Sequence, residues 1–241
     1  MVDVVRRSRT IPFAQALRER EELNLMFRDL LQREDFRGGV VLDVGTGSGR
    51  LALIVARRAH RVIGVDVEEL GLWTARAYAA VRNLPRVEFV VGDAEVVSWS
   101  EWYPKPYDFV TSNLFMSEAV VVRAGRYLRP GGRFLFCCHH TDHWKETQAG
   151  SHWAFDEARM SDLLRENGFV VEFLGVDTTA VTFDSLSQVE RLLGDRHVQK
   201  WIVDRRWEAL AQAFAAGTKQ LTLAYLVGRA RRLAARSPGP A

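Results

Sequence analysis

Short apolar runs alternate with amphipathic segments through most of this chain. The apolar runs are rich in Val, Ile, Leu and Phe with few polar interruptions, as in strands that helices cover on both faces. The segments between them repeat their apolar residues every three or four positions, which predicts helices. This alternation predicts a parallel sheet wrapped by helices. The predicted strands are 40–44, 61–66, 87–91, 107–112, 132–138, 169–174 and 220–227, and the helices between them are 51–58, 69–82, 117–127 and 156–166.

Two further regions flank this alternating core. Residues 13–33 carry apolar residues mostly three or four apart among charges, which predicts one amphipathic helix. Residues 1–12 contain a basic RRSR cluster and carry no predicted element. Before the last strand, a helix is predicted to start at 184–188, and a second one covers roughly 197–215.

A glycine-rich sequence, DVGTGSGR at 43–50, follows the first predicted strand. In a parallel sheet, ligands bind outside the carboxyl ends of the strands, where a strand turns into its helix. The three glycines allow that turn to be tight and leave bare backbone beside a ligand. The helix that begins near Ser48 directs free N–H groups to the same place. Asp43 suits a cationic group of the ligand, because a loop that binds only phosphates gains nothing from a carboxylate there.

Two more acids follow the next two strands. Asp66 ends the second strand about 20 residues past the glycine loop, where a carboxylate accepts hydrogen bonds from ribose hydroxyls. Asp93 closes the third strand, in VEFVVGDAE. Three successive strands therefore each deliver an acid to the same edge of the sheet. This regularity indicates a ligand site rather than routine capping of strand ends.

Together, these motifs resemble those of class I S-adenosylmethionine-dependent methyltransferases. DVGTGSG is similar to the family's glycine signature, and Asp66, GDA at 92–94, YDFVTSN at 107–113 and LRPGGRF at 128–134 are similar to its later motifs. The resemblance is close over 38–168 and loose elsewhere. It implies an α/β, Rossmann-like fold with a seven-stranded, mostly parallel sheet, an antiparallel last strand and helices on both faces.

The resemblance also implies that the matched residues bind S-adenosylmethionine. The glycine loop would lie against the methionine part of this cofactor, with Asp43 near its amino group. Asp66 would bind the ribose hydroxyls, Asp93 and Ala94 would meet the adenine, and Asn113 would face the methyl-transfer site. The complete predicted set is Asp43, Gly45, Thr46, Gly47, Asp66, Val67, Asp93, Ala94 and Asn113.

A nicotinamide dinucleotide domain is the alternative interpretation of this region. Such a domain prefers G-x-G-x-x-G, whereas the third glycine here comes one residue early. Asp43 and LRPGGRF also have no role in a domain of that kind. S-adenosylmethionine is therefore the favoured cofactor.

The resemblance further implies how the chain is divided, since inserts and N-terminal helices in this family commonly form a lid over a small acceptor. We expect a single domain over 1–241. Its parts would be an N-terminal helical lid at 1–37, a cofactor-binding core at 38–178, a helical insert at 179–219 and a final strand at 220–230.

The candidate catalytic residues lie in CCHHTDHW, at 137–144. This stretch leaves the fifth strand at the carboxyl edge, close to where an acceptor would bind. His139, His140 and His143 could each supply a base, because imidazole titrates near neutral pH. An equally open alternative is that they are ordinary loop residues. No metal site is predicted, since the spacing is too compressed and neighbouring strand residues point to opposite faces.

Charge and composition narrow the possible partners and location. The formal net charge is +3, and the basic residues, nearly all Arg, are scattered, so no nucleic-acid-binding stripe is present. No window approaches the apolar length of a membrane span or of a signal peptide. The two cysteines are adjacent, offer no sensible disulfide and fit a reducing compartment. We therefore expect a cytoplasmic protein.

The sequence thus predicts a methyltransferase that acts on a small molecule, most similar to the branch that methylates quinone precursors, lipids and other metabolites. An RNA or protein acceptor is the first alternative. Asn113 is followed by Leu-Phe-Met, which differs from the Pro-Pro-aromatic sequence of base-modifying relatives. The second alternative is a non-catalytic module that binds the cofactor and acts through a partner. The sequence makes no prediction of the oligomeric state.

Overall fold

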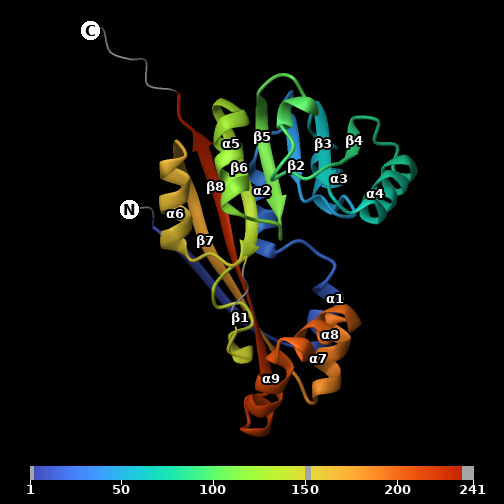
Figure 1. The fold of residues 1–241 in the computed structure, drawn as a ribbon, viewed down its shortest axis with the longest axis vertical. Helices are drawn as coiled ribbons and strands as arrows, with labels where there is room; N and C mark the ends of the chain where they lie inside the picture. The colour runs from blue at the N-terminus through green and yellow to red at the C-terminus, as the bar shows by residue number, and fades with distance from the viewer. Residues whose placement is uncertain (1–2, 150–152, 235–241) are drawn as a thin grey trace.

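The computed structural model describes residues 3–149 and 153–234, and an eight-stranded sheet runs through it (Figure 1). The strand order is β1-β7-β8-β6-β5-β2-β3-β4. All described strands are parallel except β8, which runs antiparallel to both of its neighbours. The order reverses between β2 and β5, and such a switch point is where ligands bind. The strands are β1 (Val5–Pro12), β2 (Val40–Val44), β3 (Arg61–Asp66), β4 (Val87–Val91), β5 (Tyr107–Asn113), β6 (Leu128–His139), β7 (Phe169–Thr182) and β8 (Gln220–Arg232).

Helices cover both faces of this sheet. On β2, Leu42 and Val44 pack in the layer that includes α5 and α6, whereas Val41 packs in the layer of α2, α3 and α4. Cys137 and Cys138 likewise point into opposite layers, and both are buried free thiols. The helices are α1 (Phe13–Glu19), α2 (Leu25–Arg33), α3 (Arg50–Val55), α4 (Glu69–Val81), η1 (Trp99–Glu101), α5 (Glu118–Tyr127), η2 (Lys145–Thr147), α6 (Glu157–Glu166), α7 (Leu186–Leu193), α8 (Asp195–Val203) and α9 (Arg206–Ala215).

The predicted Rossmann-like α/β fold is confirmed, with one strand more than the predicted seven. The additional strand is β1, in a region for which no element was predicted and which was assigned to a helical lid. It pairs in parallel with β7 at the edge of the sheet. Its sequence, VRRSRTIP, is mostly polar and its side chains are mostly exposed, because an edge strand on the surface needs few apolar residues. Charged side chains on such a strand also oppose pairing with other chains.

Two helices that were predicted as continuous are broken. The predicted helix at 13–33 is α1 followed by α2, with residues 20–24 between them. The second helix restarts because the side chain of Asn24 accepts a hydrogen bond from the Phe27 N–H at 3.1 Å. The helix predicted before the last strand is α8 followed by α9, and the chain turns between them at Arg205, whose φ is +64°. None of the helices in the described residues is long and apolar enough to cross a membrane.

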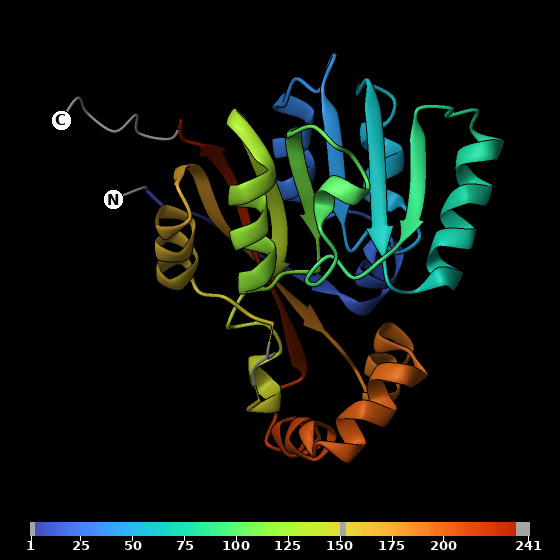
Figure 2. The same cartoon turned by 45° about the horizontal axis from the view of Figure 1, so that its top comes forward.

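The strands β7 and β8 extend past the carboxyl ends of the parallel strands and carry helices α7, α8 and α9 (Figure 2). They pair from Phe169 opposite Arg232 to Thr182 opposite Gln220. The helical insert therefore begins later than the predicted residue 179, and β8 continues past the predicted end at residue 230. Apolar side chains of β1, α1, the end of β7 and the three helices form a third core cluster. This cluster lies at the same edge as the glycine loop, facing the arrowheads of β3 and β4 in Figure 2.

Candidate active site

The glycine loop after β2 is packed at its first glycine and open at its second. Gly45 has a φ of +67°, and a Cβ added there would overlap the Phe115 side chain. Gly47 has a φ of +53°, and a Cβ added there would meet no atom within 4 Å. Only glycine adopts such backbone angles readily. The loop therefore packs against Phe115, which follows β5. At Gly47 its backbone faces open space.

Asp43 lies beneath this loop and holds it to the neighbouring strand. Its side chain is buried, with a relative exposure of 1%. The hydroxyls of Thr46 and Thr111 donate to its two carboxylate oxygens at 2.6 and 2.8 Å. Burial raises the pKa of Asp43 to about 6, although these two hydrogen bonds lower it. Asp43 thus fixes the loop against β5, and its contact with a cofactor amino group stays a prediction.

Asp66, at the end of β3, faces the same loop. Its Oδ2 accepts the Gly47 N–H at 2.8 Å, and its Oδ1 accepts the Glu68 N–H at 2.9 Å. An ionised carboxylate offers roughly four lone-pair sites, so these two bonds leave capacity for further donors such as ribose hydroxyls. Val67, the next residue, is 65% exposed beside this carboxylate. The geometry suits the role predicted for Asp66.

The loop after β4 brings the predicted adenine-side residues to the same edge. The Gly92 N–H donates to the Asp66 carbonyl at 2.9 Å, which sets the two acid-bearing loops side by side. Asp93 is partly exposed, while Ala94 is buried. The Ala94 carbonyl accepts the Trp99 indole N–H at 2.9 Å, which fixes the loop that follows.

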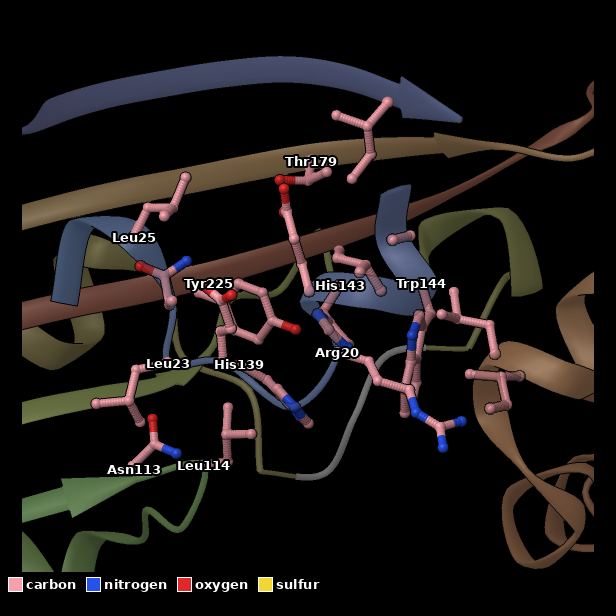
Figure 3. A pocket seen from close by; sticks show the side chains of 18 of the residues that line it. Arg20, Leu23, Leu25, Asn113, Leu114, His139, His143, Trp144, Thr179 and Tyr225 are labelled. Atoms are coloured by element: carbon pink, nitrogen blue, oxygen red, sulfur yellow. The ribbon is translucent and has the colours of Figure 1, made fainter. Parts of the chain in front are cut away.

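A cavity of about 440 Å³ lies beyond the carboxyl ends of β5 and β6 (Figure 3). Asn113 lines it, together with Leu114. Leu114 adopts a left-handed φ of +61°, and its N–H donates to the Cys137 carbonyl at 2.7 Å. The opposite walls come from α1, the segment between α1 and α2, α7 and α8. Asn113 is therefore placed between the glycine-loop edge and this half-open cavity.

The three candidate histidines do not share one environment. His139 and His143 line the cavity, whereas His140 does not. The Asp142 N–H donates to Nδ1 of His140 at 3.1 Å, and Nε2 of His140 lies 3.1 Å from a Glu157 carboxylate oxygen. His140 therefore points toward α6 and stabilises the structure there. Its prediction as a base is not supported, because neighbouring residues at a strand end point in different directions.

His139 is the histidine that could accept a proton in the cavity. Its ring nitrogens make no hydrogen bond with the described residues. Burial, with a contribution from nearby His197, lowers the pKa of His139 to about 4, so its imidazole is neutral near pH 7. His143 stacks against it, with ring centroids 4.0 Å apart and planes at 10°. The backbone of Ala224 fixes the His143 ring, whose Nδ1 lies 3.0 Å from both the N–H and the carbonyl.

Tyr225 is a cavity residue that the sequence reasoning missed. It lies on β8 opposite His139, and its ring centroid is 5.2 Å from that of His143. Its hydroxyl makes no hydrogen bond with the described residues, and burial raises the pKa of that hydroxyl, so it keeps its proton. The sequence QLTLAYLV indicates only a strand, and the face on which Tyr225 lies depends on the register with β6.

Comparisons with known proteins identify the family. Residues 35–182, more than half of the chain, match the model of a family described as a methyltransferase domain. The chain belongs to this methyltransferase family. S-adenosylmethionine is the cofactor that this membership indicates. The helices α1, α7 and α8, which line the cavity, lie outside the matched residues.

Individual relatives support this membership. Over 108 residues the methyltransferase is 39% identical to the ubiquinone biosynthesis O-methyltransferase of Neisseria meningitidis serogroup C. The aligned region covers 42% of this chain and 44% of that protein. Over 106 residues it is 37% identical to the ribosomal protein L11 methyltransferase of Deinococcus radiodurans, covering 42% and 38% of the two chains. The chain thus matches less than half the length of these curated relatives.

A solved structure shows the same fold over nearly the whole molecule. It is a protein of Bacillus halodurans described as a candidate methyltransferase, with a TM-score of 0.66 and 22% sequence identity. The match covers 86% of this chain and 99% of that one. At this level of identity, the likeness shows the fold alone.

The residues of this methyltransferase fit S-adenosylmethionine. Open backbone at Gly47 leaves room for the cofactor, and the Asp66 carboxylate retains acceptor capacity beside it. No group of three or more His, Cys, Asp or Glu side chains placed to hold a metal ion occurs in 3–149 or 153–234.

Replacing Asp66 with asparagine should weaken S-adenosylmethionine binding about tenfold or more, since a charge-assisted hydrogen bond to a ribose hydroxyl contributes roughly 1.5–3 kcal/mol. Isothermal titration calorimetry of the purified protein measures this change. Glu69→Gln is the matched control, because it removes a nearby exposed carboxylate at the start of α4. Equal affinities of the Asp66→Asn variant and the wild type would contradict the assignment.

Proposed function

We propose that the protein transfers the methyl group of S-adenosylmethionine to a small-molecule acceptor that binds in the cavity. The observation that carries this proposal is the half-open cavity of about 440 Å³ between Asn113 and the helices α1, α7 and α8. Small-molecule sites are clefts of about 300–1,000 Å³ with mostly apolar walls and a few polar groups. These helices would act as a lid, and the fold between them as the cofactor-binding core.

The bound cofactor would supply a methyl group that is already activated on a sulfonium. The protein then has to align the acceptor, exclude water and accept a proton. The glycine loop and Asp66 would orient the cofactor, and the lid helices would keep water out. A ring nitrogen of His139 would take the proton of the acceptor hydroxyl as the methyl group passes from sulfur to the acceptor oxygen, which would leave the cofactor as its neutral thioether. His143 would support this step by fixing the orientation of the His139 ring.

The names of the relatives are compatible with more than one acceptor. The Neisseria protein is named for ubiquinone biosynthesis, and the Deinococcus protein for methylation of a ribosomal protein. The volume of the cavity favours a small acceptor, since it lies in the range typical of small-molecule sites. The two buried thiols, Cys137 and Cys138, are compatible with the reducing conditions of the cytoplasm, which we propose as the location.

The acceptor class can be tested with labelled S-adenosylmethionine and one bacterial extract, separated into a low-mass filtrate, an RNA fraction and a protein fraction. We expect the purified protein to label a compound in the filtrate. The Asp66→Asn variant at the same concentration should label less. Label in RNA or protein would establish the alternative acceptor. Absence of label from every fraction, together with calorimetric binding of the cofactor, would establish a non-catalytic module.

A further inference from the structure

The inner wall of the cavity is built from aromatic rings. His143 is buried and covers one face of the His139 ring, while the rest of His139 lines the cavity. Trp144 lies 4.4 Å from His143 between ring centroids and meets Trp201 edge-on at 4.8 Å. Tyr225 completes this wall, as Figure 3 shows. A flat ring in the cavity could extend the His143–His139 stack, since aromatic rings attract each other in offset-stacked and edge-on arrangements.

Two polar atoms of this wall have no partner in the described part of the chain. The indole N–H of Trp144 is buried and makes no hydrogen bond. The hydroxyl of Tyr225 makes none either, as described above. A buried donor without an acceptor is unfavourable, and such groups usually find a partner. Both side chains line the cavity, but the indole nitrogen of Trp144 is covered, so the Tyr225 hydroxyl is the donor that the oxygen of a bound molecule can reach.

The backbone conformation of Trp144 also indicates that this wall belongs to a binding site. Its φ is +61°, a left-handed value that bulky residues rarely adopt. The strand β8 holds it there, because the Trp144 N–H donates to the Thr222 carbonyl at 2.8 Å. Glu146 holds the same strand residue, since one of its oxygens accepts the Thr222 N–H at 2.8 Å. Strained conformations of this kind persist where surrounding contacts fix them, and they gather at binding sites.

The charged residues around the cavity are held in ion pairs. Every Arg and Glu that lines it takes part in one, with Glu21 shared by Arg20 and Arg50. The imidazole of His139 is neutral near pH 7, for the reason given above. The cavity therefore offers no free charge to a charged acceptor. The ion pairs are Arg9–Glu19 at 2.6 Å, Arg50–Glu21 at 2.6 Å, Arg28–Glu22 at 3.2 Å and Arg20–Glu21 at 3.5 Å.

From these observations we propose that the acceptor is an uncharged, planar aromatic compound that carries a hydroxyl group. Its ring lies against the wall formed by His139, Trp144 and Tyr225. Its oxygen accepts a hydrogen bond from the Tyr225 hydroxyl, and a ring nitrogen of His139 takes the proton of the hydroxyl that is methylated. This inference rests on the proposed function, because it names the substrate class of the same site.

A set of four matched compounds tests the class. The reference is 2-naphthol, which is flat and neutral. Decahydro-2-naphthol has the same skeleton without planarity, 6-hydroxy-2-naphthoic acid adds a negative charge, and 6-(aminomethyl)-2-naphthol adds a positive one. Binding of each compound to the full chain is measured by calorimetry with S-adenosylhomocysteine present, so that no transfer takes place. We expect 2-naphthol to bind at least tenfold more tightly than each of the other three.

One variant tests the donor. Tyr225→Phe keeps the ring and removes the hydroxyl, and we expect it to weaken 2-naphthol binding about fivefold to tenfold, as loss of one neutral hydrogen bond does. The affinity for S-adenosylhomocysteine should not change. Tyr78→Phe is the matched control, since Tyr78 lies exposed on α4 and its hydroxyl makes no hydrogen bond with the described residues. A thermal melt of each variant verifies that it is folded.

The failures of the two proposals can be distinguished. If S-adenosylhomocysteine does not bind, the proposed function is wrong. If it binds and a charged or saturated compound binds as tightly as 2-naphthol, the acceptor class is wrong. If it binds and none of the four compounds does, the acceptor class is wrong as well. If 2-naphthol affinity is unchanged in the Tyr225→Phe variant, the assigned donor is wrong.

Discussion

Replacing Gly45 with alanine is expected to prevent stable folding, whereas the same replacement at Gly47 should leave the fold intact and abolish most cofactor binding. At Gly45, the new Cβ would overlap Phe115 in a backbone with a φ of +67°. Overpacking and a left-handed non-glycine residue together cost roughly 2–5 kcal/mol. That is a large share of the 5–15 kcal/mol by which native domains are typically stable, so the folded state would be marginal.

At Gly47, only the backbone cost of about 1–2 kcal/mol applies, because a Cβ there meets no atom within 4 Å. The methyl group would instead occupy space that the cofactor needs, and affinity for S-adenosylmethionine should fall at least tenfold. Urea denaturation measures the first effect and calorimetry the second. Gly194→Ala is the control, since its φ is +79°, its Cβ position is open and it lies between α7 and α8. A Gly47→Ala protein that binds normally would show that the loop does not contact the cofactor.

Replacing His139 with glutamine is expected to lower the methyl-transfer rate by a factor of about 10²–10⁴, the usual contribution of a positioned base. Glutamine retains a polar side chain of similar length but cannot take up the proton. Cofactor affinity should be unchanged, because His139 lies beyond the glycine loop. Single-turnover rates with the labelled acceptor measure the effect. His60→Gln is the control, since His60 is exposed at the start of β3. A rate within twofold of the wild type would exclude His139 as the base.

The pH dependence gives a second, independent test of His139. Its folded-state pKa lies at about 4, below the ordinary value of 6.5, so the neutral, proton-accepting form persists as the pH falls through 6 and 5. The acidic limb of kcat/KM should therefore lie near pH 4. In the His139→Gln variant this limb should disappear while residual activity remains. A limb near pH 6.5 in the wild type would indicate that a more exposed group is the base.

The interior of the sheet could be predicted from the sequence because its signal is local. The strands β2, β3 and β4 have the predicted bounds, since both of their faces are covered and their apolar runs are continuous. The order of the motifs also placed Asp66 and Asn113 correctly at the carboxyl edge. The carboxyl ends of parallel strands lie at one edge of the sheet, whatever the conformations of the loops. The edge that bears the predicted cofactor residues therefore follows from the alternation of strands and helices.

Features that depend on distant partners were not predictable in the same way. The hydrogen bonds of Asp43 to the hydroxyls of Thr46 and Thr111 could not be foreseen, since Thr111 is supplied by another strand. The edge strand β1 has no apolar run to reveal it. Tyr225 reaches the cavity through the register of β8 with β6. In each case the missing information is a pairing between segments that lie far apart in the sequence.

The position of β8 determines when the active site can be completed during synthesis of the protein. It lies between β6 and β7, and β7 in turn is the partner of β1. The ribosome therefore releases the N-terminal strand long before the segments that connect it to the sheet exist. The half that holds the cofactor can assemble first, from local strand–helix units, whereas the wall that carries Tyr225 must wait for residues 220–232. A nascent chain that stalls before this segment would hold a cofactor loop without an acceptor pocket.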